Sequence, residues 1–136
     1  MVRLFMKKRV NEWLKLAKVD LDSVIKLLED SNLTQSAAFH CQQSIEKSFK
    51  ALLEEQSGTF IKTHDLLRLY GLIEESGVKL NIDEDILDSI NAVYIESRYP
   101  SDIGLIPEGK PKTSTIKTFY NLSESIYSQI VSILDS

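Results

Sequence analysis

The segment 37–53, which reads AAFHCQQSIEKSFKALL, constrains the fold of this chain more than any other stretch. Its apolar side chains recur at helical spacing and form one stripe of Ala38, Cys41, Ile45, Phe49 and Leu52. Polar side chains gather roughly opposite this stripe: His40, Gln43, Lys47, Lys50 and Glu54. Because Gln43 and Lys47 are four residues apart, their side chains can touch on one helix face. The segment therefore predicts a long amphipathic helix with a distinctive polar face.

Helical periodicity extends over most of the chain. The predicted helices span residues 7–29, 35–56, 64–75, 83–98 and 114–134. We expect Thr63 to cap the short third helix, Gly77 to end it and Pro100 to end the fourth. With only 5 Gly and 3 Pro and no strand pattern, the sequence predicts an all-α fold. We expect a single domain over residues 1–136, an antiparallel up-and-down bundle of four main helices plus a short accessory helix.

The composition disfavours several classes of function. A formal net charge of -4 argues against a general nucleic-acid coat, which needs a basic surface. The lone Cys41 falls on the predicted core face and is expected to be a buried thiol. No zinc-ligand spacing and no Gly-rich phosphate loop is present, so we expect no metal and no cofactor. The apolar runs are too short for a membrane span or a secretory signal, which predicts a soluble, cytoplasmic protein.

Four short motifs follow one another along the chain. Trp13 precedes Ala-x-x-Asp-Leu at 17–21, AAFHCQQ leads into Glu-Lys-x-x-Lys-Ala-Leu-Leu at 46–53, and His-Asp-Leu and Arg-Tyr-Pro occupy 64–66 and 98–100. In this order they resemble the HEPN family, small helical domains with proposed nucleotide binding, over nearly the whole chain. The resemblance implies a four- or five-helix bundle that pairs as a homodimer. It also implies association with a minimal nucleotidyltransferase, often in a toxin–antitoxin-like system.

Other branches of that family are metal-independent RNases, in which an Arg is followed after four to six residues by a His. This chain departs from that pattern, because its only two His residues, His40 and His64, both precede Arg98. RNA cleavage of this type needs a base for the 2′-hydroxyl proton and an acid for the leaving oxygen, and an Arg stays protonated. An RNase activity would have to recruit His64 or His40 from elsewhere in the fold, so the sequence assigns no enzymatic activity.

The candidate catalytic residues are Arg98, whose guanidinium suits bidentate phosphate contact, and His64. The candidate ligand-binding residues are other polar positions of these motifs: His40, Gln43, Lys47, Asp65, Tyr99 and Asp102. Structural interpretations stay open, such as an ion pair at a helix C-terminus for Arg98 and a solvated helix face for Lys47. We also expect Glu46 and Lys50, four residues apart, to form an ion pair at the surface.

Three hypotheses about function follow. The leading one is a HEPN-like homodimeric subunit that associates with a minimal nucleotidyltransferase and presents a polar groove to a nucleotide or RNA. The second is a metal-independent RNase toxin that uses Arg98 with His64 or His40, and the third is a nucleotide-binding module without chemistry. The chain has no Gly-Ser motif followed by paired acids, so transfer chemistry would belong to the partner. A dimer interface is expected to bury some aromatic side chains of the first and last helices: Phe5, Trp13, Tyr120 and Tyr127.

Overall fold

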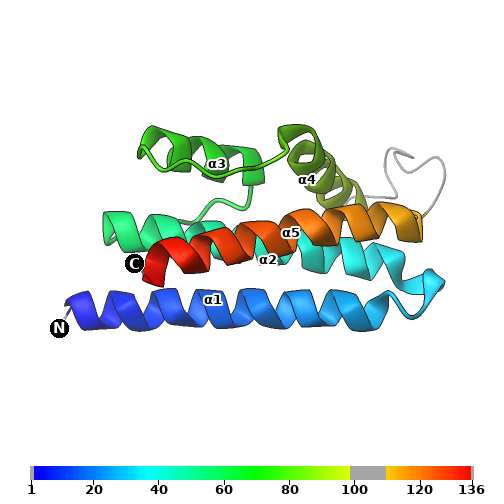
Figure 1. Ribbon diagram of the computed structural model, residues 1–136, viewed down its shortest axis with the longest axis horizontal. Helices are drawn as coiled ribbons and strands as arrows, with labels where there is room; N and C mark the ends of the chain where they lie inside the picture. The colour runs from blue at the N-terminus through cyan, green and yellow to red at the C-terminus, as the bar shows by residue number, and fades with distance from the viewer. Residues whose placement is uncertain (1, 99–109, 136) are drawn as a thin grey trace.

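The computed structural model describes residues 2–98 and 110–135 (Figure 1). Its elements are α1 (Val2–Leu27), a 3-10 turn η1 (Ser31–Leu33), α2 (Thr34–Ser57), α3 (Leu66–Glu75), α4 (Glu84–Arg98) and α5 (Thr113–Asp135). These residues contain no strand, which confirms the predicted all-α fold, and the helix bounds differ from the predicted ones by no more than five residues. Within the described residues, no helix is both long and apolar enough to span a membrane.

The start of α3 differs from the predicted one. Asp65 rather than Thr63 is the N-cap, because its carboxylate accepts the N–H of Leu67 at 3.0 Å. The Thr63 hydroxyl instead accepts the N–H of Asp65 at 3.3 Å. A carboxylate is favoured there because it also meets the positive end of the helix dipole. His64 therefore lies outside the helix, in the α2–α3 connection (residues 58–65).

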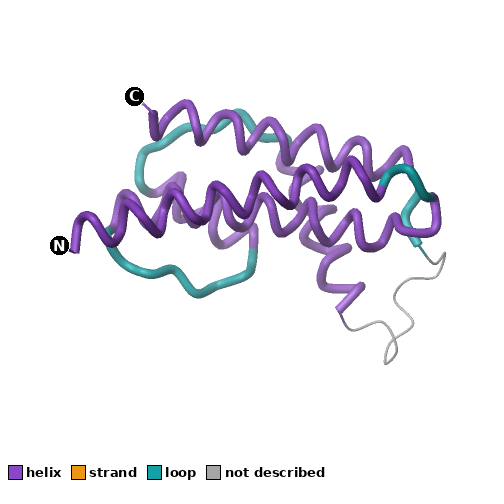
Figure 2. The backbone as a smooth tube through the Cα atoms, turned by 90° about the horizontal axis from the view of Figure 1, so that it is seen from below, coloured by secondary structure: helices purple, strands orange, loops and turns teal. Residues whose placement is uncertain are grey.

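The helices are arranged around α2. α1 and α2 form an antiparallel hairpin, α5 runs alongside in the direction of α2, and α3 and α4 lie on the side away from α1 (Figure 1). α2 ends at Gly58, whose φ of 68° is a left-handed conformation that glycine adopts at low cost. In Figure 2 the α2–α3 connection runs along one side of the α1–α2 hairpin and α5 runs along the other. α2 is therefore enclosed on several sides, which decides how its polar residues are placed.

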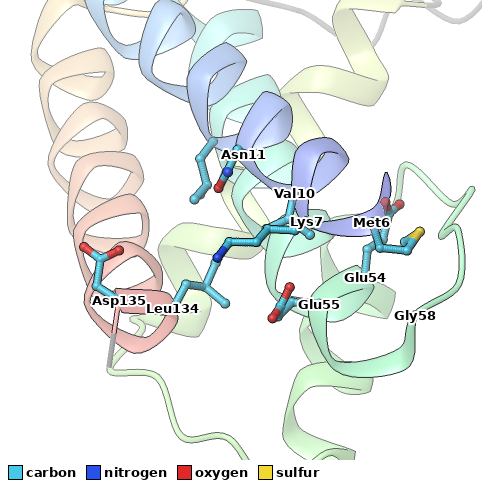
Figure 3. A pocket seen from close by; sticks show the side chains of 10 residues that line it. Met6, Lys7, Val10, Asn11, Glu54, Glu55, Gly58, Leu134 and Asp135 are labelled. Atoms are coloured by element: carbon cyan, nitrogen blue, oxygen red, sulfur yellow. The ribbon is translucent and has the colours of Figure 1, made fainter. Parts of the chain in front are cut away.

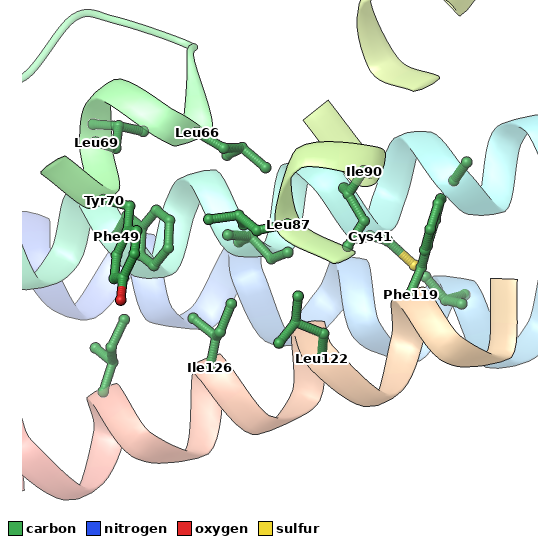
Figure 4. Close-up of a cluster of buried hydrophobic side chains, with 14 of the residues drawn as sticks. Cys41, Phe49, Leu66, Leu69, Tyr70, Leu87, Ile90, Phe119, Leu122 and Ile126 are labelled. Carbon is green, nitrogen blue, oxygen red and sulfur yellow. The ribbon is translucent and has the colours of Figure 1, made fainter. Parts of the chain in front are cut away.

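The main core lies where α2 faces α3, α4 and α5 (Figure 4). The predicted apolar stripe of α2 is buried throughout, as are the facing side chains Leu66, Leu69, Ile73, Leu87, Ile90, Ile116, Ile126 and Ile130. The Phe49 ring stacks on Tyr70, with centroids 6.2 Å apart and planes inclined by 17°. Because full burial of one such side chain contributes about 1.5–3 kcal/mol, this cluster is the main source of stability.

Cys41 lies in this core, as predicted, and provides a chemical test of it. The residue is 0 % exposed, and burial, as the largest cause, raises the pKa of its thiol from 9.0 to about 12. Because the thiolate is the nucleophile, we expect the native protein to resist iodoacetamide at mildly alkaline pH and the urea-unfolded protein to react fully. Mass spectrometry measures the labelling, and rapid modification of the folded protein would contradict this placement of Cys41.

Candidate functional site

Asp20 connects α1 to the polar side of α2. Its Oδ1 lies 2.8 Å from Nδ1 of His40, and its Oδ2 lies 2.7 Å from Nζ of Lys47. His40 and Lys47 are seven residues apart on α2, so they project on the same side and reach one carboxylate. The Asp20 side chain is buried, whereas those of His40 and Lys47 are 30 % and 19 % exposed. Two predicted ligand residues thus meet at an acid to which the sequence analysis assigned no role.

Glu46 gathers a second group of polar side chains. Its Oε2 lies 2.9 Å from Nδ1 of His64 and 3.1 Å from Nζ of Lys50. Gln42 donates to Glu46 at 3.2 Å and to the backbone carbonyl of His64 at 3.3 Å. The Gln43 amide in turn donates to Gln42 at 2.7 Å. The predicted catalytic residue His64 and the predicted ligand residue Gln43 therefore belong to one hydrogen-bond network.

The ion pair of Glu46 and Lys50 exists, but it is not at the surface as predicted. The two side chains are only 5 % and 4 % exposed. On one side Lys50 Nζ lies 5.4 Å from the ring centroid of Trp13 in α1, and on the other the α2–α3 connection brings His64 against Glu46. The surface prediction was wrong because it considered α2 without the elements that cover it. Since each buried charge costs several kcal/mol in desolvation, the pair depends on these further contacts.

Glu54 is the centre of a third group and is fully buried. Its Oε1 accepts from Nε of Arg9 at 2.6 Å and from the indole N–H of Trp13 at 2.9 Å. Its Oε2 accepts the backbone N–H of Ile61 at 3.0 Å. The Arg9 guanidinium also lies 4.1 Å from the ring centroid of Phe60. One carboxylate therefore ties α1, α2 and the α2–α3 connection together.

These three groups follow one another along the polar side of α2. We call them the ionic row: Arg9, Asp20, His40, Glu46, Lys47, Lys50, Glu54 and His64. Its three carboxylates balance the three Lys and Arg cations, and each imidazole adds a positive charge when protonated. Among the side chains that the structure describes, those of residues 4–93 and 110–135, no three His, Cys, Asp or Glu are arranged to hold a metal ion.

The remaining predicted site residues are placed differently. Asp65 caps α3 and accepts from Nδ2 of Asn91 in α4 at 3.3 Å, so its carboxylate stabilises the junction of these two helices. Arg98 is the last residue of α4, but its side chain is outside the described part of the chain, as are Tyr99 and Asp102. The roles of these three residues in a site stay predictions.

A comparison with protein families shows to which family this chain belongs. A family model of the HEPN domain matches residues 10–132, nearly the whole chain. The protein belongs to the HEPN family. The match includes every residue of the ionic row except Arg9. No curated protein and no solved structure matches the chain.

In this HEPN domain the exposed edge of the ionic row consists of three basic side chains, those of His40, Lys47 and His64. His40 and His64 each place Nδ1 on a carboxylate, and the His64 side chain is 64 % exposed. The Lys47 ammonium has three N–H donors, so its contact with Asp20 leaves donors for an oxyanion. The acids of these contacts, Asp20 and Glu46, are buried behind the bases. This edge can bind an anion while the carboxylates hold the three basic side chains in position.

A pocket of about 830 Å³ lies at the end of the HEPN domain where the two chain termini lie (Figures 1 and 3). It is formed by the first half of α1 and the C-terminal ends of α2 and α5, and Lys7 extends between Asp135 and Glu55 (Figure 3). None of the predicted site residues lines it. Because the Glu54 carboxylate is already paired with Arg9 and the two further acids Glu55 and Asp135 outnumber Lys7, the pocket is unsuited to a phosphate-bearing ligand.

Proposed function

We propose that this HEPN protein is a homodimeric subunit that associates with a minimal nucleotidyltransferase in a toxin–antitoxin-like system, and that it binds a nucleotide or RNA at the exposed edge of the ionic row. The observation that carries this proposal is the placement of His40, Lys47 and His64 at that edge, each held by a buried carboxylate. Membership of the HEPN family supports the kind of partner. We assign transfer chemistry to the partner, because the chain has no Gly-Ser motif followed by paired acids.

Phosphate binding would depend on the fixed positions of these basic side chains. A phosphate oxygen would meet N–H donors of Lys47 and of protonated His40 that are already oriented by Asp20. Little side-chain entropy is then lost on binding, since the ion pairs restrict these side chains in the unliganded protein. Protonation of the imidazoles would strengthen anion binding, because it leaves the three carboxylates facing five cations.

Lys47→Gln tests this site. The substitution removes the charge, and we expect the affinity for ATP or for a short single-stranded RNA to fall roughly tenfold, about 1.4 kcal/mol. The fold should survive, since Asp20 keeps its 2.8 Å contact with His40. Isothermal titration calorimetry measures the affinity, and Lys117→Gln, at an exposed lysine of α5, is the matched control. Equal affinities of the two variants would place the ligand elsewhere.

Association with the partner requires a separate experiment. We would co-express the HEPN protein with the minimal nucleotidyltransferase of the same genome and measure the mass of the purified species by light scattering. The expected result is a complex that contains two HEPN chains. A HEPN protein that stays monomeric and does not co-purify with the enzyme would overturn the proposal.

Two imidazole–carboxylate contacts favour a metal-independent RNase as the second candidate function. In that reaction one imidazole would take the proton of the 2′-hydroxyl as it attacks phosphorus, and the other would protonate the departing 5′-oxygen. The assay is end-labelled RNA in EDTA with wild type, His64→Asn and Arg98→Ala. We expect no cleavage by any of them. If wild type cleaves the RNA and the folded variants do not, the RNase function would be supported in place of the non-catalytic one.

A further inference from the structure

Two of the exposed apolar residues of α1 lie within a regular pattern of charges in the middle of the helix. Leu16 and Val19 are 43 % and 55 % exposed, and α1 forms one edge of the bundle (Figure 1). Glu12, Val19 and Lys26 are spaced by seven residues, so they lie in one line along the helix, with Lys15 and Asp22 along one flank. We call this surface the α1 face: Glu12, Lys15, Leu16, Val19, Asp22 and Lys26, all exposed.

The charges of the α1 face are self-complementary. Glu12 and Lys26 are equally far from Val19 and have opposite signs. A two-fold axis at Val19 would therefore place Glu12 opposite Lys26 of the partner subunit in an antiparallel helix pair. The same axis brings Lys15 close to Asp22 of the partner subunit, on one flank of the pair. Within one chain Asp22 pairs with Lys18 at 2.9 Å and Lys26 with Glu29 at 3.8 Å, so these exposed, weak pairs would exchange or share partners in the dimer. A parallel pair in register would instead set Glu12 against Glu12 and Lys26 against Lys26, which is repulsive.

We propose that a second copy of this chain docks antiparallel on the α1 face about a two-fold axis at Val19. This inference rests on the homodimer of the proposed function and assigns the surface that forms it. Symmetry repeats each contact, so the interface holds two Glu12–Lys26 pairs and two Lys15–Asp22 pairs around an apolar centre. Exposed ion pairs are individually weak, and here they set the orientation and register of apolar contacts.

A hollow beside Val19 matches this register. Its volume is about 450 Å³, and it is lined by Val19, Asp22, Ser23, Lys26, Leu27 and His40. In the antiparallel pair, Leu16 of the partner subunit lies opposite Asp22 and Ser23 and can insert there, as a knob into a hole. Because His40 lines the same hollow, the partner's α1 would lie next to the ionic row. Dimerisation and ligand binding would then be coupled through His40.

Charge reversal gives a test that distinguishes this face from others. In Glu12→Lys the two cross-subunit pairs become Lys–Lys, and in Lys26→Glu they become Glu–Glu, so each variant should dimerise at least tenfold more weakly. An equimolar mixture restores both pairs in a heterodimer, and dimerisation should return to near the wild-type level. Lys117→Glu on α5 makes the same charge change as Lys26→Glu away from this face and should dimerise like wild type. Light scattering over a dilution series measures each species, and circular dichroism checks each fold.

The outcomes separate this inference from the proposed function. Single variants that dimerise as tightly as wild type would overturn the α1 face and leave a homodimer with another interface. Weakened single variants that fail to pair when mixed would overturn the antiparallel register. A monomeric wild type would overturn the homodimer itself and, with it, this inference.

Discussion

Replacing Glu54 with alanine is expected to lower the free energy of unfolding by about 3–5 kcal/mol. The buried carboxylate accepts from Arg9, from the indole of Trp13 and from the backbone N–H of Ile61, and alanine leaves all three donors without this acceptor. The cost arises mainly at Trp13 and Ile61, since the Arg9 side chain is 33 % exposed and can be partly rehydrated. Urea unfolding followed by circular dichroism measures the change.

Two variants give this prediction its controls. Glu55→Ala makes the same substitution at the next residue, which is exposed, and should change stability by less than about 0.5 kcal/mol. Glu54→Gln keeps one acceptor oxygen and loses the charge, so it should cost about 1–2 kcal/mol. Faster hydrogen exchange at the Ile61 amide in Glu54→Ala would show that the α2–α3 connection has been released. Equal stability of Glu54→Ala and Glu55→Ala would contradict the contacts assigned to Glu54.

Helical periodicity predicted most of this fold for a physical reason. Each long helix buries one apolar stripe, so the spacing of Ile45, Phe49 and Leu52 reports directly on the side that faces the core. The cap of α3 was less predictable, because Thr63 and Asp65 are both good cap residues two positions apart. The choice between them depends on Asn91 of α4, which bonds to Leu66 and Asp65 and is distant in sequence.

The ionic row was only partly predictable. His40 and Lys47 were identified from the polar face of one helix, but their shared partner Asp20 depends on how α1 aligns with α2. The spacing of Glu46, Lys50 and Glu54 by four residues is visible in the sequence, yet charged helix residues are usually exposed. Their burial requires the α2–α3 connection, which has no periodicity that would indicate its path.

Replacing Glu46 with alanine is the second large prediction, with an expected loss of about 3 kcal/mol in the free energy of unfolding. The substitution leaves the Lys50 ammonium, only 4 % exposed, without its carboxylate. The double variant Glu46→Met/Lys50→Met removes both buried charges and fills similar volume against Trp13. We expect the double variant to be more stable than Glu46→Ala, although it carries one more substitution, because breaking a buried ion pair costs more than replacing it.

The same double variant separates the stability of the ionic row from its role in binding. Gln42 keeps its bond to the His64 carbonyl, so the backbone of the α2–α3 connection stays anchored while the His64 imidazole loses Glu46. If the position of His64 contributes to nucleotide binding, the folded double variant should bind ATP more weakly than wild type in calorimetry. Unchanged affinity would restrict the ligand site to Asp20, His40 and Lys47 and assign Glu46, Lys50 and His64 to the fold. The single variants Glu46→Met and Lys50→Met complete a double-mutant cycle. If their changes in the free energy of unfolding simply add up to that of the double variant, the two residues are not coupled, which would contradict the buried pair.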